Sequence, residues 1–165
     1  FTYDFPYEPN CLRPEGYNAS NLRVMKKVIS RGIRTLAQIP LTRVNSDDRI
    51  IEAIYNNLAE AGVDTLYLMK FFAVGRGIGR EDLKLDDEGY RRSIKTYKRL
   101  ERPDGPVVYI QTALKGNSKG RSSSRLNITY NGLLISDPWA YDKSGNPERD
   151  VILGDLKCQK FSELT

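Results

Sequence analysis

The chain has 165 residues, enough for one domain with a hydrophobic core, and 28% of them are charged. The net charge of +5 could favour an anionic ligand, but the simplest interpretation is a solvated surface. No histidine is present, so any acid–base chemistry falls to Asp, Glu, Tyr, Lys or Cys. No apolar run approaches the roughly 20 residues of a membrane span, so no membrane contact is expected.

Cys11 and Cys158 are the only cysteines, and they lie near opposite ends of the chain. Two unclustered thiols predict neither a disulfide framework nor a zinc site, and they fit a reducing, cytoplasmic environment. We therefore expect no metal ligands in this chain.

The chain opens with a strand-like segment, Phe1–Phe5, without an initiator Met, which is expected of a piece cut from a longer polypeptide. A proline-rich loop holding Arg13 follows. The next segment is predicted to be a helix that is capped by Asn18 or Ser20 and ended by Gly32. Its apolar positions are Leu22, Met25, Val28 and Ile29.

A second strand–helix pair follows. Ile33–Leu41 reads as a strand, and the next helix is predicted to start at a cap formed by Asn45 or Ser46 and to stop at Gly62. Its apolar stripe consists of Ile50, Ile51, Ile54, Tyr55 and Leu58.

The apolar run Val63–Val74 predicts a buried strand, and the cationic loop Gly75-Arg76-Gly77-Ile78-Gly79-Arg80 follows it directly. Ligands bind at the carboxyl ends of parallel strands, and an arginine there can clamp a carboxylate or phosphate. The alternative is a solvated turn. The loop does not fit a dinucleotide fingerprint, because its sixth position is Arg80 rather than glycine.

A third helix is predicted from about Asp86 to Leu100, and Val107–Ala113 reads as another strand. Strands and helices that alternate at this spacing predict an α/β fold with parallel strands and right-handed crossover helices. Four strands are too few for a closed barrel, so we expect an open sheet or a partial (half) TIM-type barrel over residues 1–115.

The composition changes after Lys115, and residues 116–165 are predicted to form a separate C-terminal extension. Arg125–Tyr130 and Leu133–Ser136, joined by Asn131-Gly132, predict a β-hairpin, since Asn-Gly supplies the positive φ angles of a tight turn.

Short motifs mark the predicted strand ends and the hairpin. In chain order they are Tyr3-Asp4-Phe5-Pro6 with Arg13, Ile33–Asn45, Gly62-Val63-Asp64 with Val74-Gly75-Arg76-Gly77, Asn131-Gly132, and Gly154-Asp155-Leu156. Together they resemble the C-terminal half of a radical SAM enzyme, covering strands four to six and a SPASM/twitch-like C-terminal extension.

The resemblance implies that the parent protein is an oxidoreductase that cleaves S-adenosylmethionine (SAM) with a [4Fe–4S] cluster to make a 5′-deoxyadenosyl radical. The missing N-terminal half of the same polypeptide would supply the cluster, and this half would shape the pocket for a small-molecule or peptide substrate. The family's C-x3-C-x2-C loop is absent here, and the extension lacks its usual cysteines. This fragment alone is therefore expected to bind no cofactor.

The same resemblance implies roles for individual residues. Asp4 would be catalytic and face the substrate, and Arg13 would bind an anionic group of SAM or substrate. The residues implied for SAM binding are Gln38, Asn45, Gly75 and Arg76. Structural alternatives remain open: a cap or loop carboxylate for Asp4, a partner of Asp4 for Arg13, and a helix cap for Asn45.

Two other functions compete with this one. A non-catalytic module could bind nucleic acid or another anion through its basic loop, which contains Lys115, Lys119, Arg121 and Arg125. A structural domain could instead close over a separate cluster-bearing domain. Because the first strand begins at residue 1, we also expect self-association at an exposed sheet edge there.

Overall fold

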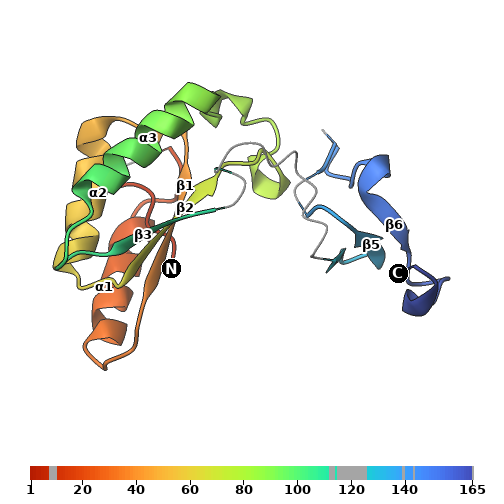
Figure 1. The fold of residues 1–165 in the computed structure, drawn as a ribbon, viewed down its shortest axis with the longest axis horizontal. Helices are drawn as coiled ribbons and strands as arrows, with labels where there is room; N and C mark the ends of the chain where they lie inside the picture. Colours follow the sequence, from red (N-terminus) through yellow and green to blue (C-terminus); the bar gives the residue numbers. More distant parts are fainter. Residues whose placement is uncertain (8–10, 112–113, 115–125, 139, 143, 165) are drawn as a thin grey trace. The chain divides into compact units, whose positions relative to one another are not determined.

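The computed structural model describes residues 1–7, 11–111, 114, 126–138, 140–142 and 144–164. The chain divides into two compact units (Figure 1). Unit 1 comprises Phe1–Phe71 and Asp82–Lys115, and unit 2 comprises Phe72–Glu81 and Gly116–Thr165. The glycine-rich loop, which the sequence analysis places in the part over residues 1–115, belongs to unit 2.

Unit 1 contains a parallel sheet of order β1-β2-β3, formed by Leu36–Leu41, Thr65–Lys70 and Val107–Ile110. The N-terminal segment adds a parallel bridge between Thr2 and Gln38 beside β1. The expected α/β class with a parallel sheet is confirmed. The predicted strand Val63–Val74 is too long, because β2 ends at Lys70 and the chain then enters unit 2.

Three helices connect these strands: α1 (Tyr17–Ile29), α2 (Asp48–Glu60) and α3 (Asp87–Leu100). They lie on the same side of the sheet (Figure 1). The core consists of alternate strand residues and the apolar stripes of the helices. Its fully buried members include Ala37, Ile39, Leu41, Leu66 and Leu68 from the strands and Met25, Ile51, Ile54, Tyr55, Leu58 and Tyr97 from the helices.

The helix ends follow local rules, but two predicted N-caps are wrong. The side chain of Asp47, not Asn45 or Ser46, caps α2 by accepting a hydrogen bond from Arg49 N. Gly16, in a left-handed conformation, is the N-cap of α1, so neither Asn18 nor Ser20 is.

The predicted stops are confirmed at Gly62 (φ 77°) and Gly32 (φ 74°), which take the conformation that favours glycine after a helix.

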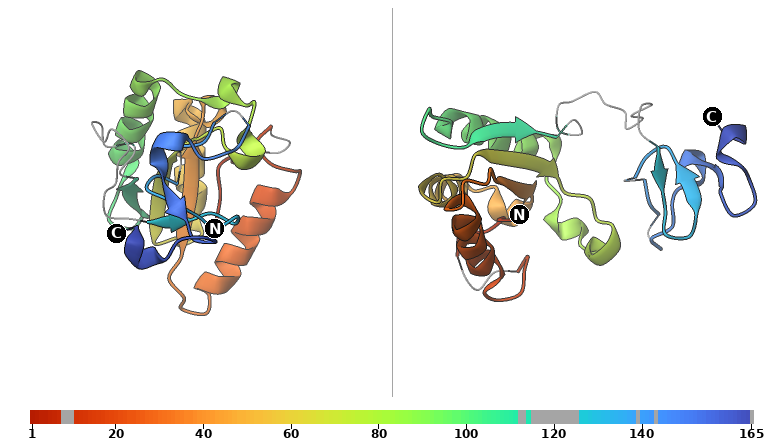
Figure 2. Two further views of the ribbon diagram at one scale, coloured as in Figure 1. Left: turned by 90° about the vertical axis from the view of Figure 1, so that its right-hand side faces the viewer. Right: turned by 90° about the horizontal axis from the view of Figure 1, so that it is seen from below.

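Unit 2 contains an antiparallel sheet of order β4-β5-β6, formed by Asn127–Ile128, Leu133–Ile135 and Ile152–Asp155. The predicted hairpin is confirmed: Thr129 N donates to Leu133 O (2.9 Å), and Gly132 has φ 85°. Figure 2 shows this sheet from two further directions.

Short 3-10 turns complete the described chain: η1 (Arg43–Asn45), η2 (Gly75–Gly77), η3 (Glu81–Leu83), η5 (Arg149–Val151) and η6 (Phe161–Glu163). Within the described residues, no helix combines the length and the apolar character that crossing a membrane requires.

Candidate functional site

The carboxyl edge of the unit 1 sheet gathers polar side chains from consecutive strands. Asp4 follows the N-terminal segment, Thr42 follows β1, Lys70 ends β2 and Gln111 follows β3. Gln111 Oε1 accepts a hydrogen bond from Lys70 N (2.8 Å), which ties the ends of two strands together. Since parallel strands present their carboxyl ends at one edge, this edge is the place where an α/β unit binds a ligand.

Asp4 is buried, with 2% of its surface exposed, and Arg13 holds its carboxylate. Both Nε and Nη2 of Arg13 lie close to Oδ2, at 2.8 and 2.7 Å. The Asp4 backbone N–H donates to Asn18 Oδ1 on α1 (3.2 Å), and the Arg13 guanidinium also lies over the Tyr17 ring, 5.1 Å from its centroid. The structure therefore brings together Asp4 and Arg13, two of the predicted site residues.

Asn45 lies against the same segment and is fully buried. Its Nδ2 donates to Asp4 O and to Pro40 O (both 2.9 Å). Its Oδ1 accepts from Thr42 N (2.7 Å) and Thr42 Oγ1 (3.0 Å). The amide thus fixes the backbone after β1 to the backbone at Asp4, and it positions the acid rather than capping α2.

Unpartnered polar atoms gather around Asp4. Among the described residues, six buried side-chain polar atoms have no hydrogen-bond partner, and they include Asp4 Oδ1, Asn18 Nδ2 and Tyr97 Oη. Burial raises the pKa of Tyr97, and the Asp4 carboxylate raises it further, so the phenol stays protonated near this charge. Because buried polar atoms are costly to leave unpaired, this cluster suits a water molecule or a polar ligand group.

Gln38 lies elsewhere, in the middle of β1 on the face of the sheet opposite the helices. The paired residues Thr2, Gln38, Tyr67 and Tyr109 form one row across the sheet on that face. Gln38 is exposed, and Tyr109 is 57% exposed. This row joins donors and acceptors to two aromatic rings. Of its members, only Gln38 is among the predicted site residues.

Gly75 and Arg76 belong to unit 2, in η2, so they are described apart from the other four predicted site residues. Gly75 has φ 56°, which explains a glycine there. The Arg76 side chain lies outside the described part of the structure. The basic residues of the alternative nucleic-acid module, Lys115, Lys119, Arg121 and Arg125, also lie outside the described residues.

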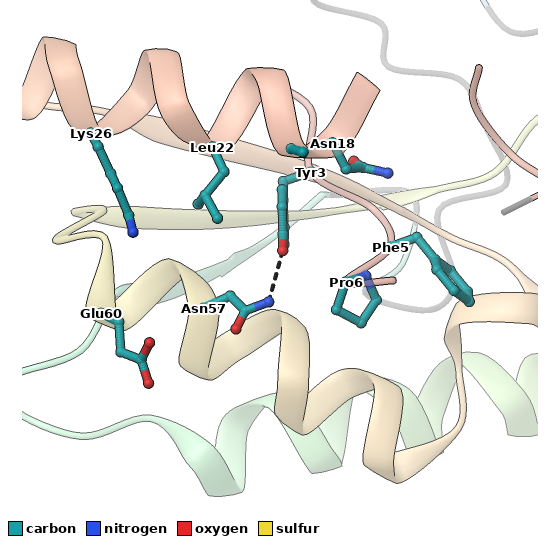
Figure 3. A pocket seen from close by; sticks show the side chains of 9 residues that line it. Tyr3, Phe5, Pro6, Asn18, Leu22, Lys26, Asn57 and Glu60 are labelled. Atoms are coloured by element: carbon teal, nitrogen blue, oxygen red, sulfur yellow. Dashed lines mark hydrogen bonds between the residues drawn. The ribbon is translucent and has the colours of Figure 1, made fainter. Parts of the chain in front are cut away.

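A cavity of about 240 Å³ lies between α1 and α2 (Figure 3). Tyr3 projects into it, and its hydroxyl accepts a hydrogen bond from Asn57 Nδ2 (2.8 Å). Lys26 from α1 and Glu60 from α2 approach one end of the cavity from opposite sides (Figure 3). This cavity is not predictable from the sequence, because helical periodicity places Leu22 and Asn57 on their helices but does not describe the space between two helices.

The thiols do not fit an iron–sulfur cluster. Cys11 belongs to unit 1 and Cys158 to unit 2, both are exposed, and a cluster needs about four such ligands. Within the described residues, no three Cys, Asp or Glu side chains gather closely enough to hold a metal ion.

The chain was also compared with known proteins. No protein-family model matches it, and no curated protein matches it.

Proposed function

We propose that the chain is the C-terminal portion of a radical SAM oxidoreductase, in which unit 1 forms half of a TIM-type barrel, shapes the substrate pocket and helps to bind SAM. The observation that supports this proposal is the one-sided cover of the sheet. In a doubly wound fold, helices cover both faces of a parallel sheet, whereas in a barrel they lie only outside. In unit 1, α1, α2 and α3 all pack against one face.

The burial of the strand residues agrees with helices on only one face of the sheet. Ala37 and Ile39 of β1 face the helices and are fully buried, whereas their neighbour Leu36 is 40% exposed. In β3, Val108 is 3% exposed, but Val107 is 49% exposed. A helix-free face with apolar and aromatic side chains is what a barrel interior requires, because that face lines the pocket of the closed structure.

Within this proposal, the side chains divide into two groups. Gln38 and the tyrosines in its row would contact ligand on the helix-free face. Asp4, held by Arg13 and Asn45, would offer its unpartnered Oδ1 at the carboxyl edge. Gly75 and Arg76 keep the SAM-binding role that the resemblance implies.

The cluster would be held by the N-terminal half of the polypeptide, since the thiols of this chain do not fit one. SAM, when bound, would supply the radical chemistry. The residues of this half would orient the ligand and exclude water.

The first test is the coding sequence upstream of Phe1, where the proposal expects three clustered cysteines. The second uses the complete polypeptide, reconstituted anaerobically. There, Gln38→Ala should weaken SAM or substrate binding about tenfold, the effect of losing one hydrogen bond of about 1.4 kcal/mol. Glu52→Ala, on the exposed side of α2, is the matched control and should leave binding unchanged.

A reading frame without such cysteines would overturn the proposal. So would strong, salt-dependent binding of single-stranded nucleic acid without SAM binding, which would instead favour the basic module.

A further inference from the structure

Hydrogen bonds from neighbouring side chains cap most of the sheet edges in the described part of the chain. At the N-terminal edge of unit 1, Thr2 O accepts from Asn21 Nδ2 (2.7 Å) and Asp4 N donates to Asn18 Oδ1 (3.2 Å). Thr2 and Asp4 are the residues whose backbone groups point away from β1, because Tyr3 N donates to Gln38 O. Two of the outward-facing backbone groups at this edge, where the sequence analysis expects association, are therefore satisfied within the chain.

The opposite edge of unit 1 is capped by an ion pair. Val108 N donates to Glu101 Oε1 (2.9 Å), and Val108 O accepts from Lys98 Nζ (2.6 Å). Lys98 and Glu101 also bind each other (2.9 Å). In unit 2, Asp155 N on β6 donates to Gln159 Oε1 (2.8 Å). Such caps block the pairing with other chains that an open edge invites.

The β4 edge of unit 2 differs from these three. Thr129 N donates to Leu133 O, so Thr129 faces β5 and the backbone groups of its neighbours at positions 128 and 130 face outward. No hydrogen bond from a described residue caps Ile128 at this edge. The side chains are also open to solvent: Leu126 is 47%, Ile128 63% and Tyr130 fully exposed.

The edge also lacks charge. The segment Leu-Asn-Ile-Thr-Tyr (126–130) has no Lys, Arg, Asp, Glu or Pro, the residues that usually protect an edge strand. It alternates apolar and polar residues, and the pattern reads the same in both directions from Ile128. A strand with this symmetry is complementary to an antiparallel copy of itself.

We propose that β4 pairs antiparallel with β4 of a second copy of this chain, about a two-fold axis at Ile128. In this register Leu126 lies opposite Tyr130 of the second copy, Asn127 lies opposite Thr129, and Ile128 lies opposite itself. Apolar residues then meet apolar residues, polar residues meet polar ones, and no like charges oppose. The two sheets of order β4-β5-β6 become one continuous sheet of both copies, an isologous contact that closes as a dimer.

The dimer should be weak, because a pair of short strands buries less surface than a standard interface. Sedimentation equilibrium of the chain is measured up to about 1 mM, where weak complexes form. We expect a monomer–dimer equilibrium for the chain without substitutions, called the parent chain in these tests. We expect a monomer for Ile128→Lys, because this change would place two ammonium groups opposite each other.

Ile33→Lys is the matched control, because Ile33 is an exposed isoleucine of unit 1, 55% exposed, away from any sheet edge. It should dimerise like the parent, and both variants should keep the parent's melting temperature. A monomeric parent at every concentration, or an Ile128→Lys variant that still dimerises, would overturn the proposal.

Cysteine cross-linking tests the register. In a background of Cys11→Ser and Cys158→Ser, Ile128→Cys places two thiols on directly opposed residues, whose Cα atoms lie about 5.5 Å apart, within the range of a disulfide. Leu126→Cys places them about 14 Å apart, because position 126 opposes position 130. Oxidation should therefore link the first variant and not the second.

Linkage at both positions, or at neither, would exclude this register. A different result would be that an unrelated extended peptide dissociates the dimers of the parent chain while Ile128→Cys forms no disulfide between copies. That result would indicate that the β4 edge binds a strand of another protein.

Discussion

The Arg13 guanidinium binds only one of the two oxygens of the Asp4 carboxylate. Nε and Nη2 both contact Oδ2, and Oδ1 remains buried without a described partner. A bidentate contact, with one guanidinium nitrogen on each carboxylate oxygen, would have given both oxygens a hydrogen-bond donor. The observed geometry instead neutralises the charge of Asp4 and leaves one acceptor position open at the carboxyl edge of the sheet.

Removal of Arg13 should leave this buried charge without its partner. We expect Arg13→Ala to lower the free energy of unfolding by about 2–3 kcal/mol at pH 7, less than the roughly 3–5 kcal/mol of a fully buried pair, because the Arg13 side chain is 26% exposed. Urea denaturation measures it. Arg34→Ala is the control, since its side chain is 87% exposed and its 3.6 Å contact with Asp64 should contribute less than about 1 kcal/mol. Equal effects of the two variants would contradict the structural role of Arg13.

A second prediction concerns the hydroxyl of Tyr97, which is fully buried without a described partner. We expect Tyr97→Phe to change the free energy of unfolding by no more than about 0.5 kcal/mol or to raise it, since no described hydrogen bond is lost. Tyr3→Phe is the matched control, because the Tyr3 hydroxyl accepts from Asn57, and this change should cost about 1 kcal/mol. A loss of about 1–3 kcal/mol for Tyr97→Phe would show that the phenol reaches Asp4 through water.

The sequence predicted the elements of unit 1 well, because their signals are local. The apolar stripe of α2 and the Gly62 stop depend on residues within one helix, and both appear in the structure as predicted. Asp86, near the predicted start of α3, is its N-cap. The hairpin at Asn131-Gly132 depends on turn chemistry, which is local as well.

The errors arise where tertiary contacts decide. Asn45 has the composition of a helix cap, but its amide binds Thr42, Pro40 and Asp4, and the last of these is distant in sequence. Asp47 caps the helix instead. The run Val63–Val74 is apolar throughout, so periodicity could not show that the strand ends at Lys70.

The candidate site was only partly predictable. Arg13 as a partner of Asp4 was one of two alternatives, and that contact is present in the structure. The row on the helix-free face depends on strand register, which pairs Gln38 with Tyr67 and Tyr67 with Tyr109. A single sequence does not specify register between strands far apart in the chain.

A third prediction concerns Gly105, which packs directly against the Tyr55 hydroxyl. A Cβ at position 105 would collide with Tyr55 Oη, which is fixed because it accepts from Arg102 N (3.2 Å) and donates to Pro106 O (3.4 Å). We expect Gly105→Ala to destabilise the protein by about 1–3 kcal/mol, the usual cost of overpacking.

A double-mutant cycle identifies the cause of that cost. Tyr55→Phe removes the oxygen that the new methyl group would meet, so the double variant with Gly105→Ala should be more stable than the sum of the single effects predicts. Thermal denaturation of the four proteins measures the coupling. Strict additivity would mean that the methyl group is rejected by the backbone of the turn and not by Tyr55.

The last prediction concerns the pH dependence of the cap on β3. The Val108 N–H bond lowers the pKa of Glu101 below its ordinary value of 4.5, and the Lys98 ammonium lowers it further. A carboxyl whose pKa is lowered in the folded state contributes stability above its unfolded pKa and loses that contribution as the pH falls through the folded value.

Glu101→Gln keeps an oxygen for Val108 but carries no charge. We therefore expect the free energy of unfolding of the chain without substitutions to exceed that of Glu101→Gln by about 1 kcal/mol at pH 7. This difference should vanish well below pH 4.5. Urea denaturation across this range measures it, with Glu52→Gln as the exposed control on α2. A difference that persists at low pH would mean that the shape of the side chain, and not its charge, caps the edge.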